Sequence, residues 1–313
     1  MDLIFMGTPS FAVPVLQALL ASDYRVVAVC TQPDRRSGRK RELLLSPVKA
    51  VAVSNRIPLV QPKTLRSPEA VEELARFHPD LIVVAAYGLI LPPTVLSLPR
   101  SGCLNVHPSL LPRHRGPSPV ANAILCGDEF SGVSIMLMDE GMDSGAVLAR
   151  QEVPISPEDT AGSLTAKLAQ LGAALLVDTL PRWLEGRIEP QPQDESQASY
   201  SRRLTSEDSE LDWHLPAVEL WRKVRAYSPW PGCYTRWQGR RLKVHQAVPV
   251  SRGVKQGEIG EVVSVSQRTA PGVGVVTLEG VLELRRIQLE GKQEMPVAEF
   301  VRGQRSFVGS VLG

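Results

Sequence analysis

The sequence predicts an α/β fold in which a parallel β-sheet with helical crossovers is followed by a small β-barrel. Over the first half of the chain, short and nearly continuous apolar runs alternate with amphipathic segments. This is the pattern of parallel strands that are buried on both faces and joined by helices. A polar segment then ends the pattern, and short β-like runs separated by glycine-containing turns follow it. The length of 313 residues, with 43% apolar content, is enough for two domains.

The expected elements of the first domain follow from these runs. Strands are expected at residues 3–6, 25–31, 80–87, 102–106, 133–138 and 146–153. Helices are expected at residues 10–21, 47–54, 67–77 and 160–183. Ser67 and Pro68 illustrate the helix signal, because serine caps a helix and proline suits its first turn. Together these elements predict a Rossmann-like domain over residues 1–189.

A linker and a second domain are expected after the long helix. Residues 190–205 are polar and proline-containing and lack periodicity, so they are interpreted as an exposed linker. Residues 206–313 then form a small, OB-like barrel. Its elements are expected as a helix at 216–226 and strands at 241–248, 258–265, 274–278 and 282–289. This part has 15 Lys and Arg against 12 Asp and Glu, and therefore carries the modest basic excess of the chain.

Composition also excludes several classes of protein. The second residue is acidic and residues 7–9 are the turn-forming Gly-Thr-Pro, so the start of the sequence does not look like the basic region and cleavage site of a signal peptide. No stretch reaches the roughly 18 uninterrupted apolar residues that a membrane helix requires. We therefore expect a cytoplasmic protein with no membrane partner. The four cysteines form no CxxC pair and are expected as small buried apolar residues.

Residues 7–10, Gly-Thr-Pro-Ser, stand where a dinucleotide-binding protein carries its glycine-rich fingerprint. Proline and serine replace the second glycine, and Phe11 would crowd a pyrophosphate. A nicotinamide cofactor is therefore not expected, and the segment is interpreted as a turn from strand to helix.

Asn105 and His107 are the most informative residues of the chain. They lie two residues apart at the end of an expected strand, so their side chains point to the same face, and Pro108 stops the strand just beyond them. Asp143 lies in a glycine-rich acidic loop after another expected strand and can bring a carboxylate beside the histidine. A structural histidine, a capping asparagine and a metal site are the competing interpretations. Too few ligands stand at metal spacing, so no metal is expected.

Three segments together resemble the signature of folate-dependent formyltransferases. They are Asn105-Val-His107-Pro-Ser-Leu-Leu-Pro112, Arg115-Gly-Pro117 and Asp143-Ser-Gly145. The resemblance implies 10-formyltetrahydrofolate as the one-carbon donor, with Asn105, His107 and Asp143 as the catalytic residues. It also implies folate contacts by Ser109, Leu110, Leu111 and Pro112. The walls of the folate slot are expected to include Tyr87, Gly88, Leu89, Ile90 and Asp139, with ordinary packing as the alternative for any one of them.

The chemistry of formyl transfer suits these residue types. Attack of an amine on the formyl carbon gives a tetrahedral intermediate whose oxygen becomes negative. The Asn105 amide can donate to that oxygen, and one such donor lowers the barrier by about 3 kcal/mol. His107 can act as a charged second donor or as a neutral base that accepts the ammonium proton, and the sequence leaves both roles open.

These residues do not decide the acceptor amine, because relatives act on glycinamide ribonucleotide, on nucleotide-linked amino sugars or on methionyl initiator tRNA. A basic loop after the second expected strand favours tRNA, since its charges can engage phosphates. The loop contains Arg35, Arg36, Arg39, Lys40 and Arg41. Arg39 is the first choice for a tRNA contact, and a solvated charged face is the alternative interpretation of the run.

Two further segments resemble the methionyl-tRNA formyltransferase family. Residues 31–49 resemble its insertion that contacts the acceptor arm, and residues 224–232 resemble the motif that opens its C-terminal domain. Trp230 and Trp237 are also expected as core residues of the barrel. The resemblance implies formyl transfer to initiator methionyl-tRNA for translation initiation, by a monomer. A nucleotide-sugar N-formyltransferase is the nearest alternative, and a non-catalytic RNA-binding protein is the alternative from another class.

Overall fold

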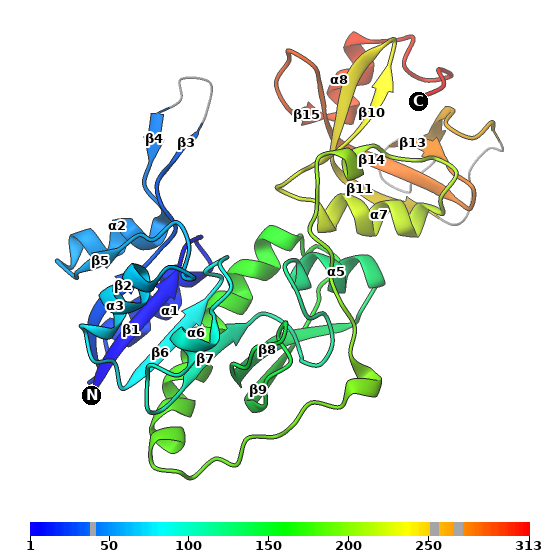
Figure 1. The fold of residues 1–313 in the computed structure, drawn as a ribbon. Coiled ribbons are helices and arrows are strands. Elements are labelled where there is room, and N and C mark those ends of the chain that lie inside the picture. Colours follow the sequence, from blue (N-terminus) through cyan, green and yellow to red (C-terminus); the bar gives the residue numbers. More distant parts are fainter. Residues whose placement is uncertain (38–41, 251–256, 266–271) are drawn as a thin grey trace. The chain divides into compact units, whose positions relative to one another are not determined.

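The computed structural model describes residues 1–37, 42–250, 257–265 and 272–313, with the backbone alone for 35–37 and 42–44 (Figure 1). The chain forms two compact units. The first contains residues 1–119, 130–154 and 164–201. The second contains residues 120–129, 155–163 and 202–313.

A seven-stranded sheet is the centre of the first unit (Figure 1). In spatial order its strands are β5 (Leu59–Val60), β2 (Arg25–Cys30), β1 (Asp2–Gly7), β6 (Leu81–Ala85), β7 (Cys103–His107), β8 (Phe130–Leu137) and β9 (Val147–Pro154). The central strands β1, β6 and β7 are almost completely buried, which explains why their sequences are continuous apolar runs. The Rossmann-like sheet predicted from those runs is confirmed.

One edge of this sheet is antiparallel. The strands from β5 to β7 pair in parallel, whereas β8 is antiparallel to both β7 and β9. Residues 138–146, which join β8 to β9, are too few for the crossover of a dozen or more residues that a parallel pair needs. The loop after β8 therefore begins beside the start of β7, where the Met138 amide donates to the Cys103 carbonyl over 2.8 Å.

Six helices lie among the described residues up to residue 184, and two of them begin at a serine cap. They are α1 (Ala12–Leu20), α2 (Pro47–Ser54), α3 (Pro68–Ala75), α4 (Pro93–Leu96), α5 (Pro119–Cys126) and α6 (Ala161–Leu184). Ser46 caps α2 and Ser67 caps α3, each accepting a hydrogen bond from the third residue beyond it. The exposed Cys126 at the end of α5 differs from the expectation of four buried cysteines, while the other three are buried.

Helix α6 covers one face of β7 and β8. A side chain at Gly172 would lie 2.7 Å from Val106 and 3.2 Å from Val133, so glycine permits the close approach of the helix to these strands. Because Val106 faces α6, its neighbours Asn105 and His107 face the opposite side of the sheet. The fold thus leaves that side of β7 available for a site.

The second unit is built on an antiparallel six-stranded sheet. Its strands are β10 (Cys233–Trp237), β11 (Arg240–Val250), β14 (Val281–Leu289), β13 (Gly272–Val276) and β12 (Val262–Val265) in spatial order, with β15 (Met295–Pro296) beside β14. Helices α7 (Ala217–Ala226) and α8 (Val297–Gly303) pack on it. Trp237 is a core residue, edge-on to Phe300 and Phe307 at 5.5 and 5.3 Å between ring centres. Trp230, which was also expected in the core, is 61% exposed.

Residues 191–201, predicted as part of an exposed linker, run along the first unit. Gln191 pairs with Val147, and Tyr200 pairs with Arg115. The Arg115 amide also donates to the Ser199 carbonyl over 2.8 Å. The polar composition of this segment suits these interactions, because its side chains and backbone supply partners to a buried arginine.

Candidate active site

Strand β7 carries the two side chains that the sequence placed on one face. Asn105 is 9% exposed and His107 is 4% exposed. The Asn105 amide nitrogen lies 3.5 Å from Asp143 Oδ1, and His107 Nδ1 lies 3.7 Å from the same oxygen. The structure therefore brings the three residues together around a single carboxylate.

The loop that carries Asp143 is held in shape from within. The Asp139 carboxylate accepts hydrogen bonds from the Gly141 amide at 3.0 Å and from the Ser144 hydroxyl at 2.9 Å. A side chain at Gly145 would lie 1.9 Å from the Leu137 carbonyl, so only glycine fits there. Asp143 has a left-handed backbone with φ of 52°, which costs about 1 kcal/mol or more and persists only where neighbouring groups enforce it. This short, tightly folded loop sets where the carboxylate stands.

Backbone groups orient the two ionisable side chains. The Gly116 amide donates to Asp143 Oδ2 over 2.8 Å, which leaves Oδ1 toward Asn105 and His107. His107 Nε2 lies 3.2 Å from the His114 carbonyl. Because a carbonyl only accepts, this bond requires a hydrogen on Nε2, and Nδ1 is then the ring nitrogen that gains or loses a proton. That nitrogen faces the carboxylate.

Arg115 and Gln193 form a support behind the Asp143 loop that the sequence analysis did not identify. Arg115 is 1% exposed and donates to Glu195 at 2.7 and 2.9 Å, to Gln193 and to the Tyr200 hydroxyl. The Glu195 carboxylate beside it raises the pKa of Arg115, and Arg115 in turn lowers the pKa of Glu195. The segment Arg115-Gly-Pro117, which resembles part of the formyltransferase signature, was the sequence feature that pointed to Arg115. Nothing in the sequence connects this segment to residues 193–200.

Residues 109–112, expected to contact folate, form a rigid turn beside β8. The Ser109 hydroxyl donates to the Arg113 carbonyl over 2.6 Å. Ser134 donates to the Ser109 carbonyl at 2.7 Å and accepts from the Leu111 amide at 3.1 Å. Leu111 is fully buried against Met136 and Val147, and Leu110 is partly exposed. The turn therefore offers backbone and the Leu110 side chain, rather than Leu111, to a bound molecule.

The segment after β6 also divides into buried and exposed parts. Tyr87 is 1% exposed, and its hydroxyl lies 3.1 Å from the Cys30 thiol, whose pKa burial raises to about 12. The Tyr87 carbonyl accepts from the Thr8 hydroxyl and the Gln32 amide. Gly88 has φ of 83° and lies against Gln32, Leu89 is partly exposed, and Ile90 is 73% exposed. The Tyr87 ring is thus a core group, and Leu89 and Ile90 are the apolar side chains available at this position.

Comparison with known proteins shows the family of the chain. A family model described as formyl transferase matches residues 1–180, and one described as formyl transferase, C-terminal domain, matches residues 203–305. The methionyl-tRNA formyltransferase of Roseiflexus sp. (strain RS-1) is 46% identical over 312 residues, which cover 99% of this chain and 95% of that protein. The chain belongs to the methionyl-tRNA formyltransferase family.

Solved structures share the fold at lower identity. The methionyl-tRNA formyltransferase from Clostridium thermocellum superposes with a TM-score of 0.55 at 17% identity, covering 90% of this chain and all of that one. The sugar 3N-formyl transferase WlaRD, whose structure was determined in the presence of dTDP and 5-N-formyl-THF, has a TM-score of 0.66 at 17% identity and covers 94% and 99%. These likenesses confirm the fold of this member of the methionyl-tRNA formyltransferase family.

The basic insertion of this family member is a hairpin with a well-defined base. Strands β3 (Arg35–Ser37) and β4 (Glu42–Leu44) pair antiparallel and extend from the body of the unit (Figure 1). Arg35 and Arg36 lie on β3, whereas Arg39, Lys40 and Arg41 lie outside the described residues.

Three side chains fix that base. The Lys49 ammonium donates to Asp34 over 2.5 Å and to Gln61 over 2.8 Å, and Gln61 donates to the Gln32 carbonyl over 3.0 Å. Lys49 lowers the pKa of the Asp34 carboxyl, so this carboxyl stays ionised at neutral pH. Because these hydrogen bonds join α2 and the residue after β5 to the start of the hairpin, they anchor it at the residue that precedes β3.

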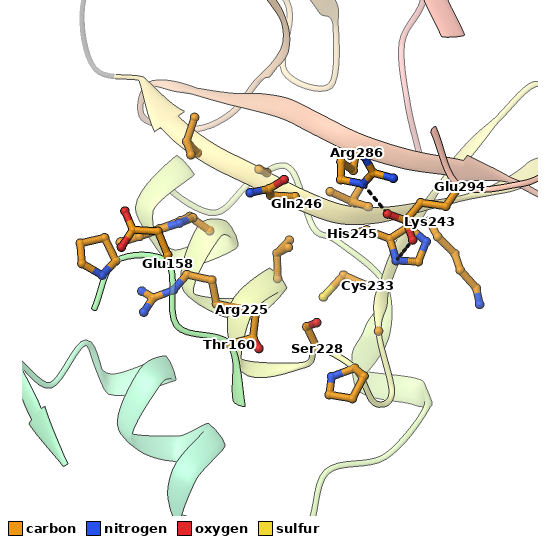
Figure 2. A pocket seen from close by; sticks show the side chains of 18 of the residues that line it. Glu158, Thr160, Arg225, Ser228, Cys233, Lys243, His245, Gln246, Arg286 and Glu294 are labelled. Atoms are coloured by element: carbon orange, nitrogen blue, oxygen red, sulfur yellow. Dashed lines mark hydrogen bonds and ion pairs between the residues drawn. The ribbon is translucent and has the colours of Figure 1, made fainter. Parts of the chain in front are cut away.

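The second unit has a pocket of about 730 Å³ between α7, β11 and residues 157–160 (Figure 2). Arg225 lies on its wall with its guanidinium 4.4 Å from the Trp221 ring centre. It donates to the backbone carbonyls of Ser156 and Asp159 at 2.7 and 2.8 Å, so its charge is engaged within the unit. Opposite it, Figure 2 shows His245 and Arg286 directed at the Glu294 carboxylate, with Lys243 on the same strand as His245. The pocket is thus mixed in charge.

A search of the described residues finds no group of three or more His, Cys, Asp or Glu side chains able to hold a metal ion. The described helices also include none with the length and apolar character needed to cross a membrane.

Proposed function

We propose that this chain transfers the formyl group of 10-formyltetrahydrofolate to the α-amino group of methionine on initiator methionyl-tRNA. The observation that carries the proposal is the convergence of Asn105, His107 and Asp143 on one side of β7, within a chain of this family. Folate serves as a co-substrate that leaves after each turnover. Translation initiation then places the activity in the cytoplasm, with the chain acting as a monomer.

Asn105 supplies the oxyanion donor. The amine attacks the formyl carbon, a C–N bond forms, and the carbonyl oxygen becomes negative. One hydrogen of the Asn105 amide points toward Asp143, and the other remains for that oxygen. A preorganised donor of this kind is worth about 3 kcal/mol of barrier. The bond between the formyl carbon and the folate nitrogen then breaks and the carbonyl reforms.

His107 moves the proton. The attacking amine carries a positive charge after addition, and the folate nitrogen needs a proton as it leaves. With Nε2 held by the His114 carbonyl, Nδ1 accepts the proton from the amine and returns it to the leaving nitrogen. Asp143 at 3.7 Å stabilises the imidazolium between these two transfers. This assignment favours the base role of His107 over that of a permanently charged donor.

The folate ring is proposed to lie against the apolar and backbone groups beside the constellation. Residues 109–112 supply backbone hydrogen-bonding groups and Leu110, and residues 88–90 supply an exposed glycine backbone and Ile90. Asp139 is exposed, but its carboxylate accepts hydrogen bonds within its own loop. Its main contribution to the folate site is therefore to hold the shape of that loop. A flat heterocycle held between apolar side chains with a few backbone hydrogen bonds is a common arrangement.

The hairpin is proposed to bind the acceptor arm of tRNA. Arg35 and Arg36 on β3 and the neighbouring Arg39, Lys40 and Arg41 give a local positive charge suited to phosphates. A nucleotide-sugar formyltransferase has a small acceptor and needs no such charge, and likeness to WlaRD is confined to the fold.

Acceptor identity is the direct test. The protein is incubated with 10-formyltetrahydrofolate and, separately, with methionyl-tRNA, glycinamide ribonucleotide and a nucleotide-linked amino sugar. Formylmethionyl-tRNA is the expected product, and the two small acceptors should remain unmodified. Formylation of the amino sugar, with methionyl-tRNA untouched, would overturn the proposal.

A further inference from the structure

Gln193 joins the buried Arg115 to the loop of Asp143. Its side-chain nitrogen donates to the Asp143 carbonyl over 2.8 Å and to the Gly145 carbonyl over 2.7 Å. Its side-chain oxygen accepts from Arg115 at 2.9 and 3.1 Å. Both hydrogens of the amide and its oxygen are therefore used inside the first unit.

These partners define the orientation of the amide. A rotated amide would place its oxygen against two carbonyls and its NH₂ group against a guanidinium, which has no acceptor. Gln193 can thus bridge the two sides in one orientation only. Glutamate at this position has the same length but no hydrogens to donate, so it would still accept from Arg115 but could not donate to either carbonyl of the loop.

Gln193 binds the loop at the residue whose backbone is left-handed. Asp143 has a left-handed φ, and Gln193 binds its carbonyl and that of Gly145 two residues on. On the other side, the Gly116 amide holds the Asp143 carboxylate. Because Gly116 follows Arg115 directly, one short segment of chain fixes Asp143 at its carboxylate and, through Gln193, at its carbonyl.

Arg115 is itself bound on several sides. Glu195 and Tyr200 hold its guanidinium together with Gln193, and it is almost completely buried. Glu195 already neutralises its charge, so a neutral partner is sufficient at position 193. The Glu195 and Tyr200 side chains extend to the surface, whereas the Arg115 guanidinium that they bind together with Gln193 is buried.

We infer that Gln193 is a positioning residue for formyl transfer, which sets the angle at which the Asp143 carboxylate meets His107 and Asn105. It touches neither substrate and acts only through Asp143. The inference rests on the proposed function of the Asp143 site. It predicts that removal of the Gln193 donors lowers the rate of the chemical step and leaves the binding of both substrates unchanged.

The test compares Gln193→Glu with Gln191→Glu as the matched control. Gln191 lies in the same segment, and among the described residues its exposed side chain hydrogen-bonds only to the Glu189 carbonyl, so its replacement adds the same charge without removing a hydrogen bond to the loop. For Gln193→Glu we expect kcat to fall by about 10- to 100-fold, as a misplacement near 1 Å can cause, with KM for folate and methionyl-tRNA within about 2-fold of the wild type. For Gln191→Glu both constants should be unchanged.

A second pair of variants separates positioning from a general loss of structure. In an Asp143→Ala background, Gln193→Glu should reduce kcat by no further factor, because the residue it positions is gone. A further loss equal to that seen in the wild-type background would overturn the inference, as would an unchanged kcat in the single variant. Should Gln193→Glu fail to fold, Gln193→Met, which also lacks the donors, replaces it in both backgrounds. Failure of Asp143→Ala itself to slow formyl transfer would instead refute the proposed function.

Discussion

The catalytic constellation and the basic hairpin are two polar regions of the first unit that are built in opposite ways. In the constellation, buried strand residues and a tightly folded loop direct every functional group to one point, with Asn105 and His107 both within 3.7 Å of the Asp143 carboxylate. In the hairpin, hydrogen bonds among Asp34, Lys49 and Gln61 fix the base, and the basic residues follow Asp34 in the sequence.

This difference suits the roles proposed for the two regions. Stabilising an oxyanion and moving a proton require donors held at defined distances, whereas attraction of a polyanion requires charge more than exact geometry. We therefore expect substitutions in the constellation to change kcat and substitutions in the hairpin to change KM for tRNA.

The largest effect is expected from Asn105→Ala. Removal of an oxyanion donor should lower kcat by about 10²- to 10³-fold, because the donor acts mainly in the transition state, while KM for methionyl-tRNA stays close to that of the wild type. Steady-state kinetics with both substrates measures the two constants. Asn55→Ala, at an exposed helix end of the same unit, serves as the control and should leave both constants as they are. A change confined to KM would contradict the assignment.

A smaller effect is expected when the hairpin loses charge. The triple substitution Arg39→Ala, Lys40→Ala and Arg41→Ala should raise KM for methionyl-tRNA by about 10-fold or more and leave kcat intact. The slope of log affinity against log salt concentration should also become shallower. The expected change is about 0.9 for each duplex phosphate that the protein no longer neutralises. Titration at several salt concentrations measures this slope. The exposed Arg66→Ala should change it little, and an unaltered slope in the triple variant would remove the hairpin from the tRNA interface.

The base of the hairpin should matter less than its charge. Lys49→Met removes the partner of Asp34 and should raise KM for methionyl-tRNA only a few-fold, since the basic residues remain. Because Lys49 holds the pKa of Asp34 below its usual value, the pair stabilises the fold fully above pH about 4 and this contribution disappears as the pH falls through the lowered pKa. Melting temperatures of the two proteins should thus differ at pH 5 to 8 and approach each other as the pH falls below about 4. A difference that grew on acidification would contradict this account of the base.

The smallest expected effect is the coupling between the two regions. Combining Asn105→Ala with the triple hairpin substitution should multiply their effects on kcat/KM to within about 2-fold. One substitution is proposed to act on the chemical step and the other on tRNA binding, and independent effects add to about 0.3–0.5 kcal/mol. A double-mutant cycle measures any departure from this product. A coupling of tenfold would show that the hairpin also takes part in arranging the reacting groups.

The parts of the site that the sequence could predict are those determined by local rules. Asn105 and His107 share a face because they are two residues apart in a strand, and the strand was visible as an apolar run. Glycines in the loop of residues 139–145 indicated a tight turn able to present a carboxylate. The resemblance to known formyltransferases added which of these residues belong together.

The remaining features depend on tertiary packing. The antiparallel pairing of β8 with β7 and the burial of Tyr87 against Cys30 have no local signal, because each depends on which segments meet in the folded sheet. Gln193 lies in a segment whose composition resembles a linker, yet it hydrogen-bonds to the buried Arg115, which is far away in the sequence. Trp230 is exposed, although tryptophan is highly buried on average. Its exposure depends on its surroundings in the second unit, which the sequence does not reveal.

Single-turnover kinetics at saturating methionyl-tRNA and 10-formyltetrahydrofolate tests the central claim most directly, because binding no longer limits the rate under these conditions. The wild type, Asn105→Ala and the triple hairpin variant are compared. We predict that the hairpin variant reacts at the wild-type rate and that Asn105→Ala reacts about 10²- to 10³-fold more slowly. A wild-type rate in Asn105→Ala, or a reduction of that size in the hairpin variant, would contradict the assignment of chemistry to the constellation and of acceptor binding to the hairpin.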